Sequence, residues 1–574
     1  MKAKLILIIS ICLIIYSCKV ENKSMEEKLL TPFELNENTT ASYDEIINYY
    51  QQLAQRNKFI TIEEAGTTDV GKPLHLVKIS NQKHSENKVT LFINNGIHPG
   101  EPCGIDASMM FVRDITESDS LRFFLENIDI ILIPVYNVGG ILNRGSYSRA
   151  NQNGPQSYGF RGNAKNLDLN RDFIKADSKN AQSFQKIFTK YNPQIMVDTH
   201  TSNGADYQYT MTLIATQKDK LTPSQKRLLE ESMLPFLYKS MEDVGYGMTP
   251  YVNANGTPDT GIYGFLDSPR YSSGFAALHH CVSFMPETHM LKPFKDRVLS
   301  TYQFLMSILD YTHQHAEEII DSQREAIEYY SQLEEAPIDW KLNQSLVDSL
   351  VFKGYEAKYK KSEVSSDLRL YYDRNEAFAR DIPYYNAYDV AQTVRIPKAY
   401  YIPQAYDAVI ERLKNNGVQL ERIEKDTLMR GSYSYISSYE DLPAYEGHYL
   451  HRKIMIDQKV SEKVFYAGDY KINTKQRARR FIIETLEPNA PDSYFAWNFF
   501  DGILMQKEYF SDYVFEDLAA GLLAENTELK QRYHEAIMQN PELDTNAAMA
   551  LDWIYKQSVY FEPSYKQYPI WREF

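Results

Sequence analysis

Two short runs of this chain place potential metal ligands directly after buried strands, and this arrangement constrains the fold more than any other feature. Residues 89–93 (VTLFI) form an apolar run of strand character that turn residues end, and His98 and Glu101 follow it. Residues 193–197 form a second such run, and His200 follows that one. Ligands of open α/β sheets bind beyond the carboxyl ends of the strands. We therefore expect an α/β fold with a metal site at this edge of the sheet.

The ligand types indicate what kind of metal site this would be. Two imidazoles and one carboxylate leave a coordination position open for water, as a catalytic zinc requires, whereas a structural zinc takes four ligands, usually thiolates. The chain has only 4 cysteines, so a thiolate site is excluded. Cys12 and Cys18 belong to an N-terminal leader, and Cys103 and Cys281 form either one disulfide or two buried thiols. A His-x-x-Glu pair alone arises by chance in many chains, so other motifs must support the site.

An amide and a guanidinium lie side by side in residues 166–173 (NLDLNRDF), where the planar arginine fork can bind a carboxylate. A helix cap with a surface ion pair is the alternative interpretation. The run resembles the Asp-x-Asn-Arg-Asn-Phe element of the M14 zinc carboxypeptidases, and the resemblance extends over the first half of the chain. It implies these roles: His98, Glu101 and His200 as the metal ligands, Asn170 and Arg171 as the pair that binds the substrate's terminal carboxylate, and Asp168 as the acid that orients the first ligand histidine.

Two further motifs extend the resemblance. Tyr251 precedes residues 256–259 (GTPD) at the spacing of the family's mobile-tyrosine loop, so Tyr251 is expected to cap the bound C-terminus. Residues 281–287 (CVSFMPE) resemble the strand that delivers the general base, which makes Glu287 the expected catalytic residue. His289 would share a strand face with Glu287, and we interpret it as a neighbour of the site.

These residues permit water attack on an amide carbonyl. Zinc lowers the pKa of bound water to about 7 and polarises the carbonyl oxygen, while Glu287 would take the water's proton and pass it to the leaving nitrogen. An arginine aimed at the developing oxyanion is worth about 3 kcal/mol by analogy with an oxyanion-hole donor. In several branches of the family this arginine precedes the Asn-Arg pair. Arg161 fits best, and Arg149 and Arg144 are weaker candidates in the same loop-like stretch.

The resemblance implies a zinc-dependent exopeptidase, with one zinc ion per chain, that hydrolyses the C-terminal peptide bond of extracytoplasmic peptides. A cell-wall peptide carboxypeptidase and an acyl-amino-acid amidohydrolase would use the same site, because Arg171 would hold a carboxylate in each case. A catalytically inert peptide-binding lipoprotein is disfavoured, because such proteins commonly lose a ligand or the base. Pro258 occupies the position at which digestive members select the C-terminal side chain, so no acid there selects lysine or arginine.

The start of the chain has the pattern of a secretory signal. A short basic segment precedes an apolar run at residues 5–16, which is too short to cross a membrane. Residues 15–18 (IYSC) resemble a bacterial lipobox, in which the cysteine becomes the acylated mature N-terminus. We expect a signal peptide at residues 1–17 and a polar tether at residues 18–36, with lipidation at Cys18 holding the protein at the outer side of a bacterial membrane, in the periplasm or on the cell surface. Plain secretion is the alternative.

The length and the net charge of the chain limit the number of domains and the kinds of partner. At 574 residues the chain exceeds the usual size of one domain. We expect a zinc carboxypeptidase-like domain at residues 37–335, built as a mixed twisted sheet covered by helices, and a second α+β domain of unknown role at residues 338–574. A net charge of -14 without any basic run argues against nucleic acid as a partner. The expected partners are peptides with a free C-terminal carboxylate and, through the lipid, a membrane.

Overall fold

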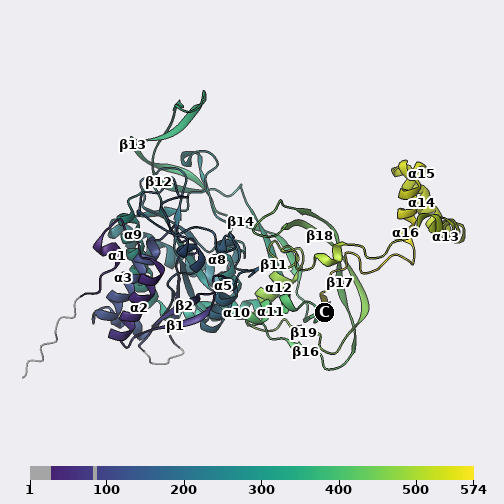
Figure 1. Cartoon of the computed structure of the whole chain (residues 1–574), viewed down its shortest axis with the longest axis horizontal. Coiled ribbons are helices and arrows are strands. Elements are labelled where there is room, and N and C mark those ends of the chain that lie inside the picture. The colour runs from purple at the N-terminus through teal and green to yellow at the C-terminus, as the bar shows by residue number, and fades with distance from the viewer. Residues whose placement is uncertain (1–27, 82–86) are drawn as a thin grey trace, which may run out of the picture.

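The computed structural model describes residues 28–81 and 87–574 of the chain. An α/β body holds the N-terminal half, an antiparallel sheet region adjoins it, and a small group of helices lies at the far end of the molecule (Figure 1). The predicted signal peptide, residues 1–17, and Cys18 lie outside the described residues. Within the described ranges, no helix combines the length and the apolar character that crossing a membrane requires.

A nine-stranded mixed sheet forms the centre of the α/β body, in the order β1-β2-β4-β3-β5-β10-β7-β8, with β6 paired to β10. Strands β4, β3, β5 and β10 run parallel to one another. Three pairs are antiparallel: β1 with β2, β2 with β4, and β7 with β10. Almost every residue of β3 and β5 is buried, as expected for parallel strands covered on both faces. The strands are β1 (Ile60–Thr67), β2 (Pro73–Ile79), β3 (Val89–Asn94), β4 (Ile128–Ile133), β5 (Ile195–Asp198), β6 (His200–Ser202), β7 (Met211–Ala215), β8 (Met248–Pro250) and β10 (Val282–His289).

Helices pack on both sides of this sheet, with α2, α3 and α9 on one side and α5 and α8 on the other (Figure 1). Helix α2 begins at a capping box, in which the Ser42 backbone N–H donates to the Glu45 carboxylate at 2.8 Å. The helices of the body are α1 (Pro32–Leu35), α2 (Tyr43–Arg56), α3 (Cys103–Glu117), α4 (Val138–Leu142), α5 (Lys179–Tyr191), α6 (Pro223–Arg227), α7 (Leu234–Asp243), α8 (Ser272–Leu278), α9 (Phe294–Gln314) and α10 (Ala316–Gln332). The α/β class with a mixed sheet, predicted from the sequence, is confirmed.

The second half of the chain begins with two strand pairs. Strands β11 (Glu335–Leu342) and β14 (Tyr388–Arg395) pair with each other, and between them β12 (Asp348–Lys361) and β13 (Leu368–Tyr385) form the long hairpin that projects from the body (Figure 1). The base of this hairpin joins the body, because β13 pairs with β9 (Ile262–Tyr263). The second half therefore contributes structure to the α/β body as well as its own sheet.

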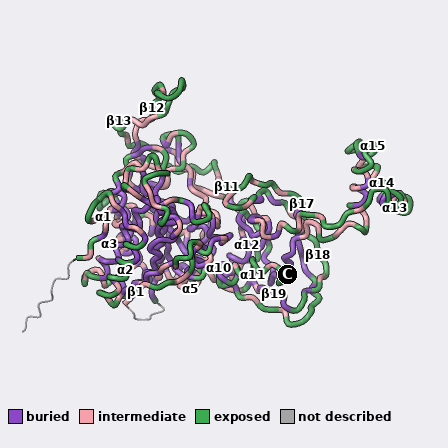
Figure 2. The backbone as a smooth tube through the Cα atoms, in the orientation of Figure 1, coloured by how far each residue is buried: buried purple, intermediate pink, exposed green. Residues whose placement is uncertain are grey.

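The separate sheet of the second half has six antiparallel strands in the order β16-β19-β15-β20-β17-β18. The strands are β15 (Ala399–Ile402), β16 (Glu421–Arg422), β17 (Thr427–Asp441), β18 (His451–Phe465), β19 (Tyr470–Asn473) and β20 (Trp571–Glu573). Helices α11 (Asp407–Asn415) and α12 (Arg479–Leu486) accompany it. The remaining helices, α13 (Asp512–Glu525), α14 (Thr527–Gln539), α15 (Glu542–Thr545) and α16 (Ala547–Gln557), form the distant group, whose surface is mostly exposed (Figure 2).

The two halves share one hydrophobic core. Tyr400, Leu413, Phe481 and Trp497 of the second half belong to the same buried cluster as the central sheet. Strand β11 begins at Glu335, so regular structure spans the predicted boundary between residues 335 and 338. The division into domains at residues 37–335 and 338–574 stays a prediction, and the last part of the predicted tether forms α1, in which Phe33 is buried.

Candidate active site

The sheet brings the three predicted metal ligands together. Strand β3 ends at Asn94, Gly96 adopts the left-handed conformation (φ 67°) that turns the chain, and His98 and Glu101 follow before α3 begins. His200 is the first residue of β6. One ligand atom from each of His98, Glu101 and His200 lies within 4.8 Å of the others, and all three side chains are buried.

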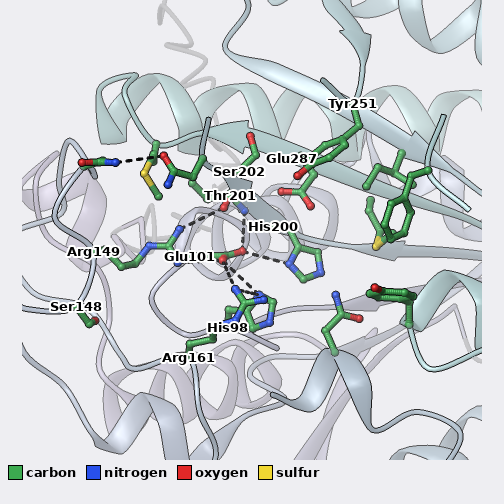
Figure 3. Close-up of a pocket in the computed structure, with 18 of the residues that line it drawn as sticks. His98, Glu101, Ser148, Arg149, Arg161, His200, Thr201, Ser202, Tyr251 and Glu287 are labelled. Atoms are coloured by element: carbon green, nitrogen blue, oxygen red, sulfur yellow. Dashed lines mark hydrogen bonds and ion pairs between the residues drawn. The ribbon is translucent and has the colours of Figure 1, made fainter. Parts of the chain in front are cut away.

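The Glu101 carboxylate contacts both imidazole rings (Figure 3). His98 Nδ1 is 3.3 Å from Glu101 Oε1, and His200 Nδ1 is 3.2 Å from Glu101 Oε2. The backbone N–H of Thr201 also donates to Oε2, at 2.8 Å, and Arg149 Nη1 donates to Oε1, at 3.0 Å. Arg161 Nη1 lies 3.4 Å from the same Oε1, so five neighbours fix the glutamate, and the Nδ1 atoms of both histidines face it.

A carboxylate lies behind each ligand histidine. His98 Nε2 donates to Asp168 Oδ1 at 2.9 Å, in the orienting role predicted for Asp168. His200 Nε2 donates to Asp198 Oδ2 at 3.0 Å, and Ser272 Oγ donates to the same oxygen at 2.5 Å. Such partners fix the tautomer and raise the basicity of a ligating imidazole. Asp198 was not predicted, although its position two residues before His200 is a signal that could have identified it.

The charges of the cluster suit a metal cation. Burial alone would raise the pKa of Glu101, but His98, Arg149 and His200 hold that pKa well below its usual range. Burial would lower the pKa of His200, yet Asp198 and Glu101 raise it well above its usual value. The carboxylates that favour a proton on this ring equally favour a metal ion, whose binding releases the proton. Two neutral imidazoles and an ionised carboxylate therefore fit a zinc ion.

Glu287 lies on β10 directly beside His200, to which it is paired in register between β10 and β6. Burial, reinforced by the charge of Glu101, raises the pKa of Glu287 to about 7. A carboxyl with a pKa near neutrality is suited to accept and release a proton. His289, two residues further on, is buried, and its Nε2 donates to the carbonyl of Ala205 at 2.9 Å, so it has a structural role outside the cavity.

The three candidate arginines differ in their hydrogen-bond partners and in how far they are exposed. Arg161 Nη2 donates to Asp168 at 2.8 Å, and its Nη1 lies 3.3 Å from His98 Nδ1, while 45% of the side chain stays exposed. Arg149 is bound to Glu101 and to the Thr201 carbonyl, and only 12% of it is exposed. Arg144 lies outside the cavity, bound to the carbonyls of residues 40 and 41. Arg161 is therefore the arginine most available to a substrate, and Arg149 supports the ligand Glu101.

The predicted substrate-binding residues line the same cavity, whose volume is about 530 Å³. The side-chain oxygen of Asn170 accepts from the Ser272 backbone N–H at 3.2 Å, so its amide nitrogen is the free donor. The Arg171 guanidinium lies over the ring of Tyr271, at 4.5 Å. Tyr251 lies next to Glu287 in Figure 3, and burial raises its pKa above the usual range. One cavity thus unites the predicted ligands, the predicted base and the pair Asn170 and Arg171.

The apolar part of this cavity differs from the sequence expectation. Pro258 is buried in the short 3₁₀ helix Pro258–Thr260 and is not among the cavity residues. Ile214 of β7, Met285 of β10 and Phe265 line the apolar part instead. Of the described residues that line the cavity, the carboxylates are Glu101 and Glu287 alone.

A mixed α/β sheet that carries a buried His-Glu-His group, an acid of near-neutral pKa and an arginine in one cavity is the arrangement of a metal-dependent peptidase. Cys103 and Cys281 are buried free thiols and take no part in the group.

Comparisons with known proteins agree with this class. Residues 46–229 match the zinc carboxypeptidase family, peptidase family M14. Carboxypeptidase 2 of Trichophyton equinum is 22% identical over 477 residues, which cover 78% of this chain and 81% of the relative. Carboxypeptidase B of Helicoverpa zea is 35% identical over 124 residues, or 20% of this chain and 27% of the relative. A metallo-carboxypeptidase structure from Pseudomonas aeruginosa is 16% identical, with a TM-score of 0.38 over 49% of this chain and 70% of that one.

Residues 46–229 thus match the M14 family of zinc carboxypeptidases, and the protein is a metallocarboxypeptidase. The group His98, Glu101 and His200 is consistent with the single zinc ion typical of that family.

Proposed function

We propose that the protein is an exopeptidase that removes the C-terminal residue of peptides outside the cytoplasm, with Glu287 as general base. The observation that carries this proposal is the position of Arg171 and Asn170 in the same cavity as the His98–Glu101–His200 group and Glu287. A cationic fork at this place recognises a free carboxylate, and recognition of the carboxylate restricts cleavage to the last peptide bond.

Each residue of the cavity has a distinct role in the proposed reaction. When bound, zinc supplies an activated water and polarises the carbonyl of the scissile bond. Glu287 accepts the water's proton at its carboxylate and transfers it to the leaving nitrogen, which a pKa of about 7 permits in both directions. Arg161 faces the developing negative charge, and Tyr251 covers the bound residue. Arg171 and Asn170 hold the terminal carboxylate throughout.

The apolar lining supports a preference for apolar C-terminal side chains. Ile214, Phe265 and Met285 offer contact area without a charge. Glu101 and Glu287 are the cavity's carboxylates, and both are engaged in the metal group and the chemistry, so none remains to pair with a lysine or arginine side chain of the substrate. We expect phenylalanine or leucine to be released faster than lysine, arginine or glutamate.

The test is mass spectrometry of a mixed peptide library, with free and amidated C-termini, incubated with the zinc-loaded protein and with Glu287→Gln. We expect stepwise loss of apolar C-terminal residues from the free peptides alone, and no cleavage by the variant. Cleavage of amidated peptides at the same rate would refute the role of Arg171. Cleavage confined to cell-wall peptides or acyl-amino acids, supplied as further substrates, would replace the peptide assignment while keeping the site.

The location outside the cytoplasm is supported by the sequence of residues 5–18, where an apolar run precedes Cys18. We propose that lipid on Cys18 anchors the enzyme at a bacterial membrane. Mass spectrometry of the mature N-terminal peptide from the membrane fraction should show a diacylglyceryl modification, and Cys18→Ser should move the protein into the soluble fraction. An unmodified N-terminus would exclude the anchor.

A further inference from the structure

The second half of the chain reaches the carboxylate-binding residues. Strands β17 and β18 are joined by residues 442–450, which we term the 442–450 loop. In the body, residues 166–177 carry Asp168, Asn170 and Arg171. Between these two segments, separated by more than 260 positions in the sequence, the structure records three side-chain contacts.

The first contact fixes the guanidinium of Arg171. Its Nε donates to the hydroxyl oxygen of Tyr445 at 3.0 Å, while its Nη1 donates to the Asn170 carbonyl at 2.9 Å. Tyr271 lies under the guanidinium plane at 4.5 Å. Among the described residues no hydrogen-bond partner is recorded for Nη2, and the side chain is 22% exposed. Because the Tyr445 hydroxyl occupies Nε and the Asn170 carbonyl occupies Nη1, Nη2 is the guanidinium nitrogen that remains for a ligand.

The ring of Tyr445 is itself fixed by Trp497 of the second half and by Arg270 of the body. Its ring stacks on Trp497, with centroids 6.1 Å apart and planes 21° from parallel. The guanidinium of Arg270 lies 5.8 Å from the Tyr445 centroid and 5.3 Å from that of Trp497, and it forms an ion pair with Asp492 at 2.9 Å. Trp497 is fully buried, and its Nε1 donates to Asp492 at 3.0 Å. The hydroxyl that meets Arg171 is thus placed by a rigid support.

The other two contacts lie on either side of the first. Glu446 Oε2 accepts from the backbone N–H of Asp168 at 2.7 Å, and His448 Nε2 donates to Asp177 at 2.6 Å. Glu446 adopts the left-handed backbone conformation (φ 49°), which turns the loop toward the body. The 442–450 loop therefore supports residues 166–177 at two positions: at Asp168, which orients His98, and at Arg171, which faces the cavity.

We propose that Tyr445 is a positioning residue for Arg171, so that the antiparallel sheet region completes the substrate-carboxylate site of the peptidase. The proposal rests on the proposed role of Arg171 in binding the terminal carboxylate. An arginine side chain has many rotamers, and a ligand that binds it must otherwise restrict them. Tyr445 restricts them before the substrate arrives, which increases affinity for a carboxylate without changing the metal group.

The test is Tyr445→Phe in the full-length, zinc-loaded protein, which removes one hydroxyl and keeps the stacked ring. Tyr449→Phe is the matched control, because Tyr449 belongs to the same loop and its side chain is largely exposed. We expect Tyr445→Phe to raise KM for peptides with a free C-terminus by about tenfold, the size expected for losing a hydrogen bond to a charged group, with kcat within about twofold of wild type. The control should change neither constant.

Binding gives a readout that does not depend on turnover. N-acetyl-phenylalanine carries a free carboxylate and N-acetyl-phenylalanine amide lacks it, and both are titrated into proteins that also carry Glu287→Gln, so that neither is hydrolysed. We expect Tyr445→Phe to weaken binding of the acid, measured by calorimetry, by the same factor as KM, and to leave binding of the amide, zinc content and melting temperature unchanged. Equal binding of the acid by wild type and Tyr445→Phe would overturn the proposal, as would a fall in kcat alone. Absence of cleavage by the wild type, with this difference in binding retained, would instead refute the proposed function and keep the positioning role.

Discussion

Asp106 gives a quantitative test of how burial controls the stability of the body. It lies on α3, the helix that follows the ligand Glu101, and its side chain is fully buried. The Thr40 hydroxyl and the Ala41 N–H, at 3.3 Å, donate to its carboxyl group and tie the N-terminal segment to α3. Burial outweighs these hydrogen bonds and raises the pKa of Asp106 from 3.8 to about 7.

The sign and size of the effect follow from linkage. Because the folded-state pKa exceeds the unfolded value, the stability that this group contributes is complete below pH 3.8 and is lost as the pH rises through 7. A shift of about 3 pKa units corresponds to about 4 kcal/mol, of which about 2 to 3 kcal/mol falls between pH 5 and pH 8. Asp106→Asn does not titrate. Relative to wild type, the variant should therefore gain that amount of unfolding free energy between pH 5 and pH 8.

The assay is urea unfolding followed by circular dichroism at both pH values, analysed as the difference between variant and wild type. Carboxylates with lowered pKa values, such as Asp168 and Asp177, destabilise both proteins equally on acidification and cancel in that difference. Asp44→Asn, at an exposed position of α2, is the matched control for the loss of one carboxylate. A difference for Asp106→Asn that is equal at pH 5 and pH 8 would refute the reasoning.

Four further predictions concern the metal group and its arginines. Asp198→Asn should weaken zinc binding about 10- to 100-fold, measured by competition with a chromogenic chelator, because the amide no longer orients His200 as a carboxylate does; unchanged affinity would exclude that role. Arg161→Gln should lower kcat by about 10²- to 10³-fold with zinc retained, if it stabilises developing charge. Arg149→Gln should instead lower zinc affinity, since Arg149 holds Glu101, and a reversal of these two effects would exchange the assigned roles. Removal of the metal with a chelator should abolish hydrolysis, and added zinc should restore it; activity that survived dialysis against the chelator would contradict the metal mechanism.

The sequence predicted the parts of the site that are local. His98, Glu101 and Glu287 each follow or belong to a strand whose apolar pattern is visible, and the strand order then brings them together. The ranking of Arg161 above Arg149 and Arg144 stays a prediction until tested, but the structure explains why spacing alone could not decide it. Arg149 and Arg161, twelve positions apart in one loop, both reach Glu101, at 3.0 and 3.4 Å.

Other parts had no local signal. The contact of Tyr445 with Arg171 joins residues 274 positions apart, and a tyrosine among 44 gives no indication of its partner. Pro258 illustrates the opposite problem, because its spacing from Tyr251 matched a family position while the backbone takes it into a buried turn. The apolar side chains that line the cavity, Ile214, Met285 and Phe265, come from β7, β10 and the segment after β9.

The distribution of contacts separates metal chemistry from substrate anchoring. Every described partner of the ligands His98, Glu101 and His200 comes from the α/β body. The second half meets the carboxylate-binding segment through Tyr445, Glu446 and His448, and it also binds residues 175–177 through Arg412 and Arg270 through Asp492. Loss of the Tyr445 hydroxyl can therefore alter KM while the zinc affinity stays constant, whereas a substitution of a residue that orients a ligand, such as Asp198, alters metal binding. Because the two halves also share a hydrophobic core, the support for Arg171 persists as long as the chain is folded, and the carboxylate site is formed before a peptide arrives.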